Sequence, residues 1–192
     1  MSRLILASCS PRRSELLKRI GLSFDTYAPK VDETCVLPAE EAVMHLSQLK
    51  AIAAAEAYPC CFVLAADTLV SCDGVVLGKP ADHNDAICML HLLSGRTHQV
   101  YTGITVISPD GRVFSDRDRT DVTFVSLTDD EILSYVHSGE PMDKAGAYAL
   151  QGRAGMWINH LNGSDSSVIG LPLYLVRSLL LRAGFPILPA AD

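Results

Sequence analysis

The segment that most constrains the fold lies near the start of the chain, where an apolar run leads directly into an amphipathic stretch. The run Leu4–Ala7 is typical of a buried strand, and the apolar residues that follow it recur at helical spacing. Ser10 is a favourable N-cap, Pro11 suits the first helical position, and Gly21 provides a C-terminal stop. The segment therefore predicts a strand followed immediately by a helix.

Two arginines, Arg12 and Arg13, lie in the first turn of this predicted helix. Cations at that position oppose the helix dipole, so they need a compensating partner. A phosphate chain would bind well at this point, where backbone N–H groups come together with the hydroxyls of Ser8 and Ser10 and with two guanidinium groups. The alternative is that both arginines are merely solvated. The two serines and the positioned proline favour a bound anion.

Composition limits the class of protein and of ligand. The 192 residues suit one domain or two closely joined lobes, and 48% hydrophobic residues suffice for a sizeable core. A net charge of −6 argues against broad nucleic-acid binding. The charge is uneven, because residues 1–31 carry six Lys or Arg and only two Asp or Glu. This local basic excess suits a small polyanionic ligand.

Several sequence features indicate a cytoplasmic protein. No apolar run approaches the ~20 residues of a membrane span, and Met1–Arg3 leads into the first strand without a secretory segment. The six cysteines lack metal-type CxxC spacing, and the six histidines are scattered. We therefore expect reduced thiols and no zinc site.

Strand and helix patterns alternate along the rest of the chain. The predicted strands cover 24–28, 62–70, 75–77, 100–107 and 121–125, with a broken strand region at 148–161. The predicted helices cover 38–57, 82–93, 128–139 and 171–182, the third with a capping box from Thr128 to Glu131. Hairpins mixed with crossover helices predict an α/β fold with a mixed central sheet flanked by helices.

One aspartate, Asp67, interrupts the apolar run Phe62–Val70. An ionised carboxylate is costly to bury in such a run. It can face a cleft at the end of the strand and bind a metal ion or cations, or it can cap a neighbouring loop. This residue alone does not decide between the two.

Three further polar positions are candidates for ligand binding. Lys79 lies between Gly78 and Pro80, which fix the backbone on both sides, and this segment resembles an incomplete P-loop. Lys50 lies on the predicted long helix. Each lysine by itself is more typical of a solvated surface than of a binding site. Gln151 offers a donor and an acceptor to a base edge, although a glutamine at a strand end is more often structural.

Taken in order, the motifs of this chain resemble those of the Maf family of nucleotide pyrophosphatases. The match extends over nearly the whole chain, and it depends on the number and order of the motifs rather than on any one of them. The matching motifs include LASCSPRRSELL (6–17), VDET (31–34), LKA (49–51), AADT (65–68), LGKP (77–80), SGRTHQVYTGI (94–104), SGEPMDKAGAYALQG (138–152) and GLPL (170–173).

The resemblance implies an αβα fold related to the inosine-triphosphate pyrophosphatases, with a single domain over residues 1–192 and two lobes around a cleft. It implies hydrolysis of a nucleoside triphosphate to the monophosphate and pyrophosphate with a divalent cation, magnesium or manganese. It makes Asp67 the catalytic carboxylate, as general base or as metal ligand, and places Glu33 near the metal. It places four residues around the phosphates: Ser8, Arg13, Lys50 and Lys79. It also suggests a role in removing non-standard nucleotides and in cell-division control.

Three positions bear on base preference within the family that this chain resembles. The branch acting on dTTP and UTP carries Arg, Thr and Gln, whereas the branch acting on 7-methyl-GTP tends to carry Trp, Gln and Glu. This chain has Arg12, Thr68 and Gln151, so it resembles the pyrimidine branch. Preference for 7-methyl-GTP or another modified nucleotide is the alternative. The chain departs from the family at Ala65, usually Gly, and at Asp165, where Tyr is common.

Two other classes of function are less consistent with the sequence. A nucleotide-binding regulatory module would need the phosphate site but no cleft aspartate, so Asp67 argues against it. A nucleic-acid-binding protein would need a basic surface with interleaved aromatic residues, which this acidic chain lacks. We therefore expect a small nucleotide as the partner, with neither nucleic acid nor membrane, and a homodimer as the candidate assembly.

Overall fold

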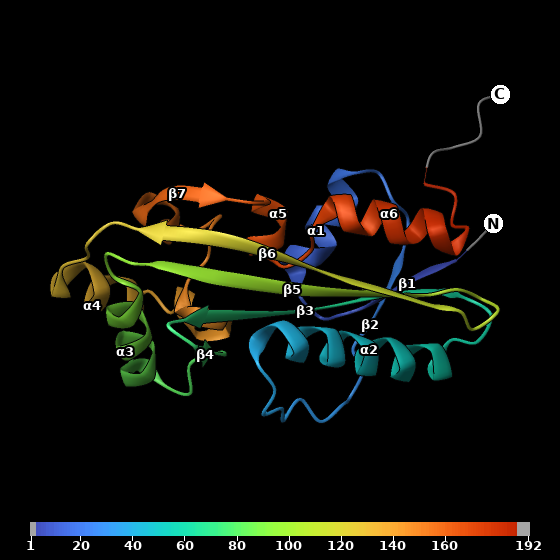
Figure 1. Ribbon diagram of the computed structural model, residues 1–192, viewed down its shortest axis with the longest axis horizontal. Coiled ribbons are helices and arrows are strands. Elements are labelled where there is room, and N and C mark those ends of the chain that lie inside the picture. Colours follow the sequence, from blue (N-terminus) through green and yellow to red (C-terminus); the bar gives the residue numbers. More distant parts are fainter. Residues whose placement is uncertain (1–2, 188–192) are drawn as a thin grey trace. The chain divides into compact units, whose positions relative to one another are not determined.

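Strands and helices alternate through residues 3–187, the part of the chain that this computed structural model describes (Figure 1). The strands are β1 (Leu4–Ala7), β2 (Asp25–Tyr27), β3 (Phe62–Cys72), β4 (Val75–Leu77), β5 (Thr97–Ile107), β6 (Val113–Phe124) and β7 (Ile158–Asn162). The α-helices are α1 (Pro11–Arg19), α2 (Ala39–Ala57), α3 (His83–Leu93), α4 (Asp129–His137), α5 (Asp165–Ile169) and α6 (Leu173–Ala183). Short 3-10 helices follow α4, namely η1 (Glu140–Asp143), η2 (Ala145–Ala147) and η3 (Arg153–Trp157). No helix within residues 3–187 has both the length and the apolar character that crossing a membrane requires.

The strands form one mixed sheet in the order β2-β1-β3-β5-β6-β7, with β4 paired to the end of β3. β1 runs parallel to β2 and β3, whereas β4 is antiparallel to β3 and β7 is antiparallel to β6. Asp73 and Gly74, with φ of 50° and 81°, form the tight turn between β3 and β4. The sheet and the helices beside it confirm the predicted α/β class with a mixed central sheet.

The described residues group into two compact units. The first consists of residues 3–67, 102–118 and 170–187, and the second of residues 68–101 and 119–169. Three strands, β3, β5 and β6, contribute residues to both units. The expectation of a single domain over residues 1–192 stays a prediction.

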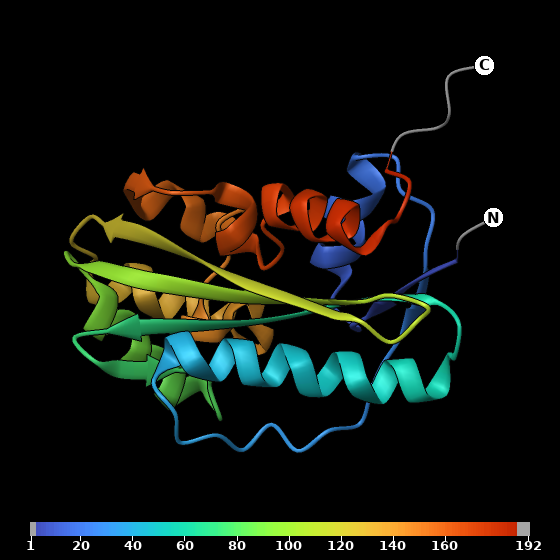
Figure 2. The same cartoon turned by 45° about the vertical axis from the view of Figure 1, so that its right-hand side comes forward.

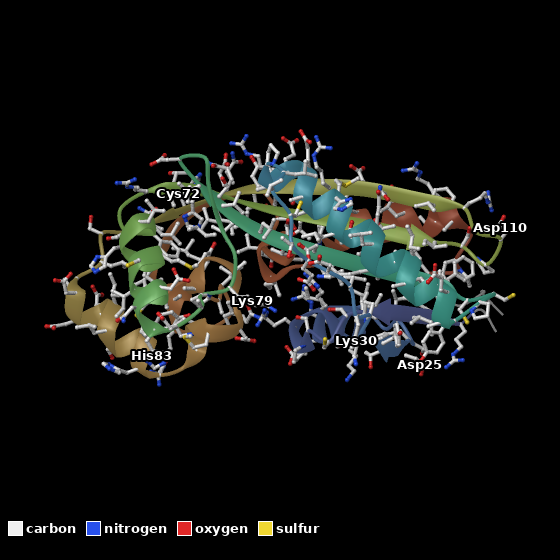
Figure 3. The ribbon with its side chains drawn as sticks, turned by 90° about the horizontal axis from the view of Figure 1, so that it is seen from below. Asp25, Lys30, Cys72, Lys79, His83 and Asp110 are labelled. Atoms are coloured by element: carbon white, nitrogen blue, oxygen red, sulfur yellow. The ribbon has the colours of Figure 1, made fainter. Side chains whose placement is uncertain are left out.

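In the first unit, helices cover both faces of the strands. α2 lies on one face, and α1 and α6 lie on the other (Figures 1 and 2). A Cβ atom at Gly103 of β5 would lie 2.3 Å from the Val43 carbonyl oxygen of α2, so the helix backbone rests directly on the strand. The strands β5 and β6 are joined by a turn that contains Asp110 (Figure 3). The core beneath α2 consists of small aliphatic residues: Ile5, Ala7, Ala51, Ala54, Val63, Ala65 and Ile107.

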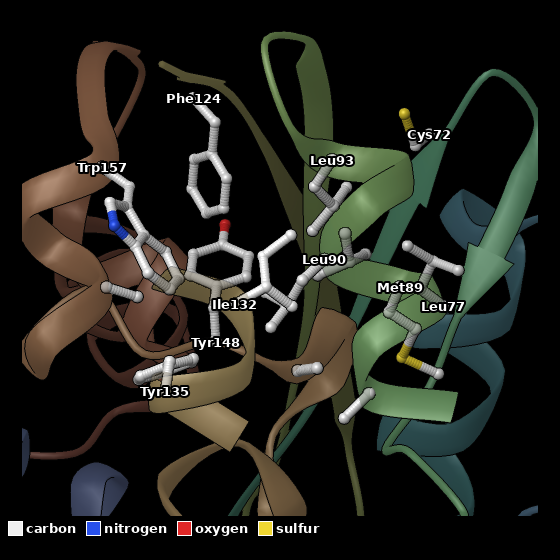
Figure 4. Packing of buried hydrophobic residues seen from close by; sticks show 14 of the residues in the cluster. Cys72, Leu77, Met89, Leu90, Leu93, Phe124, Ile132, Tyr135, Tyr148 and Trp157 are labelled. Atoms are coloured by element: carbon white, nitrogen blue, oxygen red, sulfur yellow. The ribbon is translucent and has the colours of Figure 1, made fainter. Parts of the chain in front are cut away.

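The core of the second unit combines aliphatic side chains with a group of aromatic ones (Figure 4). Phe124 packs edge-to-face against Tyr148 and His98, and Trp157 packs in the same way against Tyr135. The Tyr148 hydroxyl lies 2.9 Å from Nε2 of the buried His98. Burial lowers the pKa of His98 to about 4, so its ring is neutral at neutral pH. α3 and α4 pack against each other beside this cluster.

The strand β6 begins at Val113, eight residues before the predicted start at Asp121. The extra residues include the polar run Ser115–Arg119, whose composition is typical of a loop. They form a strand because their backbone pairs with β5 while most of their side chains are at least partly exposed. Pairing in the sheet overrides the low strand propensity of charged residues.

The predicted broken strand at 148–161 is wrong over most of its length, because only β7 is a strand there. The chain folds back on itself instead. The Gly152 amide donates to the Ala149 carbonyl at 3.1 Å, and a Cβ atom at Gly155 would lie 2.5 Å from the Leu150 carbonyl oxygen. Because these glycines permit such a close approach of the backbone to itself, the apolar segment does not form an extended strand here.

Candidate active site

The junction of β1 and α1 forms as the sequence predicted. Ser10 is the N-cap and Pro11 begins the helix. The Ser10 hydroxyl makes no capping hydrogen bond, and the neighbouring Ser8 hydroxyl instead accepts from the Ser10 amide at 3.1 Å. The first turn of α1 therefore carries amide groups without the usual side-chain cap, next to a buried serine hydroxyl.

Arg13 is tied into the first unit at two points. Its Nη1 donates to the Ser8 hydroxyl at 3.2 Å, and its Nε donates to the Gly170 carbonyl at 2.8 Å. Burial lowers the pKa of Arg13, and the negative charges of Asp67 and Glu33 act in the opposite direction. The alternative of a merely solvated side chain is therefore wrong for Arg13. Arg12 is half-buried in the same helical turn.

Lys50 of α2 joins two carboxylates. Its Nζ lies 2.6 Å from Asp67 Oδ1 and 3.0 Å from Glu33 Oε1. The side chains of Lys50 and Asp67 are only 11% and 9% exposed, whereas Glu33 is 56% exposed. The prediction that Asp67 lies at a strand end is wrong, because β3 continues to Cys72 and pairs there with β4. The ion pair with Lys50 offsets the cost of burying the charged Asp67 carboxylate.

These contacts decide between the alternatives for Lys50, which is a mostly buried ion-pair partner rather than a solvated lysine of the helix surface. Asp67 pairs with the Lys50 ammonium, and its role toward a ligand stays a prediction. In a buried pair of this kind, removal of one partner leaves an uncompensated charge.

The carboxylate oxygens of Asp67 and Glu33 suit a divalent cation whose coordination shell is completed by a bound substrate. Asp67 and Glu33 both accept from the single ammonium of Lys50, so two carboxylates converge on one cationic atom. No group of three or more His, Cys, Asp and Glu able to hold a metal occurs within residues 3–187. Magnesium commonly takes one or two protein carboxylates and completes its shell with phosphate oxygens and water. The residues present therefore fit a cation that arrives with a phosphorylated substrate.

The second unit holds the other three predicted site residues. Thr68 follows Asp67 directly in β3 and is half-buried. Lys79 lies exposed in the loop after β4 (Figure 3). Gln151 lies exposed in a turn, not at the strand end that the sequence predicted, because the chain folds back before η3. The Gly146 amide of η2 donates to the Gly78 carbonyl, next to Lys79, at 3.0 Å.

The structure thus brings together five of the predicted residues in the first unit. In the first unit Ser8, Arg13, Glu33, Lys50 and Asp67 interact directly or through their charges. The motif GLPL (170–173) contains Gly170, but its sequence predicts no role for this residue in the site. Gly170 contributes its backbone carbonyl to the hydrogen bond with Arg13. No sequence pattern marks a main-chain acceptor 157 positions away from its donor.

Comparisons with known proteins show which family this chain resembles. The family model described as Maf-like protein matches residues 3–183. The chain is 47% identical over 190 residues to the dTTP/UTP pyrophosphatase of Symbiobacterium thermophilum, covering 97% of each chain. It is 49% identical over 183 residues to the dTTP/UTP pyrophosphatase of Moorella thermoacetica, covering 94% of each chain.

Solved structures at low sequence identity share the fold. The Ham1 protein of Staphylococcus aureus is 18% identical with a TM-score of 0.54, and the match covers 94% of this chain and 99% of that chain. A HAM1 protein from Coxiella burnetii is 15% identical with a TM-score of 0.56, and the match covers 95% of this chain and 100% of that chain.

Proposed function

Because the chain belongs to the family of Maf-like proteins, we propose that it hydrolyses nucleoside triphosphates to the monophosphate and pyrophosphate, with dTTP and UTP preferred. Relatives named dTTP/UTP pyrophosphatase, which match this chain over nearly its whole length, support the substrate class. The observation in the structure that carries the proposal is the buried pairing of Lys50 with Asp67, in the same unit as the hydrogen-bonded Ser8 and Arg13.

Ser8, Arg13 and the first amides of α1 bind phosphate oxygens in this proposal. A guanidinium that donates to Ser8 and Gly170 is held in one orientation, so its positive charge can bind phosphate oxygens at a reduced ordering cost. Lys50 adds a second positive charge in a mostly buried position. Both cations offset the negative charge that the phosphate oxygens carry during cleavage of the anhydride bond.

Asp67 and Glu33 hold the divalent cation, magnesium or manganese. We favour this role over that of general base for Asp67, because both carboxylates already converge on one cationic atom. A divalent cation bound there supplies neutralisation of phosphate charge and activation of water. Exchange of Asp67 for asparagine should then raise the magnesium concentration needed for half-maximal activity, whereas loss of a general base would leave it unchanged.

Base preference is assigned to Arg12, Thr68 and Gln151. A uracil or thymine edge presents carbonyl acceptors around an N–H donor, and an amide side chain can serve both kinds of group. Gln151 is exposed on its turn, so its amide is accessible to a base. Lys79, exposed in the neighbouring loop of the same unit, is assigned to the phosphates.

The test is release of pyrophosphate from a nucleotide panel with magnesium. We expect dTTP and UTP to have higher kcat/KM than CTP, and all three to exceed ATP, GTP and 7-methyl-GTP. Absence of pyrophosphate release from every nucleotide would contradict the proposed activity. Preference for 7-methyl-GTP or ATP would contradict the assignment of the pyrimidine branch alone.

We also propose a cytoplasmic location and a homodimeric assembly. All six cysteines, which lie within residues 3–187, are free thiols, as expected in a reducing compartment. Light scattering of the purified protein tests the dimer, and localisation of a tagged copy in cells tests the compartment.

A further inference from the structure

The turn that carries Gln151 is fastened by two side chains that the proposed chemistry does not use. The hydroxyl of Tyr135, in α4, donates to Glu140 Oε1 at 3.0 Å and accepts from the Ala149 amide at 3.3 Å. The same Glu140 oxygen accepts from the Arg153 amide at 3.0 Å. The backbone amides two residues before and two residues after Gln151 are therefore both bound by the Tyr135–Glu140 pair.

The Glu140 carboxylate also packs against the residue that follows Gln151. A Cβ atom at Gly152 would lie 1.8 Å from Glu140 Oε1. The backbone at Gly152 has a φ of −101°, which any residue can adopt, so the Glu140 carboxylate rather than the backbone conformation leaves no space for a Cβ atom here. The glutamate thus holds the turn by contact as well as by hydrogen bonding.

Both members of the pair are themselves held in place. The ring of Tyr135 is buried and packs edge-to-face on Trp157, with the ring centroids 4.8 Å apart. Burial raises the pKa of Tyr135, so its hydroxyl stays protonated and can donate to the carboxylate. The Lys144 ammonium donates to the Glu140 carbonyl at 2.6 Å and fixes the backbone of the glutamate.

We propose that the Tyr135–Glu140 pair positions Gln151 and so sets the discrimination between uracil or thymine and other bases. The inference rests on the proposed function and extends it to two positioning residues. Selection by hydrogen bonds requires donor and acceptor within a few tenths of an ångström of their partners. An exposed glutamine on a turn without these contacts would lose that geometry, because binding of a base would first have to order the turn and its side chain.

The sharpest test is Gly152→Ala, because it displaces the carboxylate while keeping every polar group of the pair. The displaced atom is the far end of a flexible side chain, so the variant should fold normally. Glu140→Ala removes the carboxylate and leaves the Arg153 amide without its acceptor. In both variants we expect the ratio of kcat/KM for UTP over CTP to fall at least about fivefold. Glu140→Gln should keep the ratio near that of the wild type, because its amide oxygen can accept both hydrogen bonds.

Tyr148→Phe is the matched control for Tyr135→Phe. Each substitution removes one buried hydroxyl from the same aromatic cluster, but the Tyr148 hydroxyl contacts His98 and not the turn. We expect Tyr135→Phe to lower the UTP/CTP ratio and Tyr148→Phe to leave it unchanged at similar melting temperatures.

Two outcomes would overturn the inference. One is a wild-type UTP/CTP ratio in a folded Gly152→Ala protein, and the other is an equal fall of the ratio in Tyr135→Phe and Tyr148→Phe. A wild-type enzyme without preference for UTP would instead overturn the proposed base preference, so the two failures are distinguishable.

Discussion

The two units hold their candidate functional residues by different physical means. In the first unit, ionised side chains project from regular elements, with Asp67 on β3, Lys50 on α2 and Arg13 on α1. The core beneath α2 is built from alanine and other small aliphatic residues. In the second unit, Lys79 and Gln151 lie exposed in loops, and the core of that unit includes the aromatic side chains of Phe124, Tyr135, Tyr148 and Trp157.

The difference matches two different tasks. Small core residues let a helix lie directly on a strand, which fixes the spacing of a buried ammonium and a buried carboxylate. Loops fastened by hydroxyl and carboxylate groups can change sequence without rebuilding a core, which suits the recognition of one base among several. The first unit is therefore expected to tolerate substitution at its charged residues poorly, and the second to respond with altered selectivity.

The largest effect should come from breaking the charged set of the first unit. Asp67→Asn removes one carboxylate charge at little steric cost and leaves Lys50 with Glu33 alone. We expect a loss of at least ~100-fold in turnover of dTTP, together with a higher magnesium requirement. Steady-state kinetics across magnesium concentrations measure both. Turnover near that of the wild type in a folded variant would contradict the assignment.

A pair of cation deletions compares the two units directly. Arg13→Ala and Lys79→Ala should each raise KM and slow turnover by about tenfold, because each removes a charge-assisted contact to phosphate. Only Arg13→Ala should also lower the free energy of unfolding, by about 1–2 kcal/mol, since it leaves the Gly170 carbonyl without its donor. Lys79 is exposed, so its loss should change stability by less than about 0.5 kcal/mol. Chemical denaturation of both variants measures the free energy of unfolding. Equal decreases in Arg13→Ala and Lys79→Ala would contradict the expected difference between the two units.

A smaller and more selective effect is expected in the second unit. Gln151→Glu replaces a side chain that donates and accepts with one that, when ionised, only accepts. We expect kcat/KM for dTTP and UTP to fall about tenfold, with an unchanged melting temperature. A panel of nucleotides compared with the wild type is the measurement. An equal loss on every nucleotide would show that Gln151 contributes to catalysis rather than to base preference.

The smallest effect concerns the pH dependence of stability in the aromatic core. The pKa of His98 is about 4 in the folded protein, below its ordinary value of 6.5, so the unfolded chain binds a proton that the native one does not. Stability is therefore lost as the pH falls from 6.5 toward 4, by about 1 kcal/mol between pH 7.5 and pH 5.5. The glutamine of His98→Gln cannot titrate, so this variant should lack that loss of stability between the two pH values. Denaturation curves at the two pH values test the difference, and identical slopes in both proteins would contradict it.

The sequence predicted the elements whose local signals agree with their surroundings. The helix α1 begins at Pro11, and the capping box from Thr128 to Glu131 begins α4, as capping patterns indicate. The extension of β6 through Ser115–Arg119 could not be predicted, because it depends on pairing with β5 rather than on local propensity.

The candidate site shows the same division. Motifs identified Lys50 and Asp67 as separate candidates, but only the fold shows that their side chains form a buried ion pair. The motif GLPL contains Gly170, but it does not show that the Gly170 carbonyl accepts a hydrogen bond from Arg13, since a backbone oxygen is common to all residues. Contacts of side chains with distant main-chain atoms are the part that periodicity and spacing do not encode.

The hydrogen bond between Arg13 and Gly170 also bears on the order in which the chain acquires its structure during synthesis. Its two residues are 157 positions apart, and the first unit is assembled from three separate stretches of chain. β1 and α1 leave the ribosome early, but Arg13 has no Gly170 carbonyl to bind until the segment that leads into α6 has been made. Formation of such long-range contacts is slow, because distant segments must be brought together first. The residues at the start of the chain that we propose to bind phosphate would thus be among the last to be fixed in place, so that a nascent or truncated chain would carry the charged groups without their final arrangement.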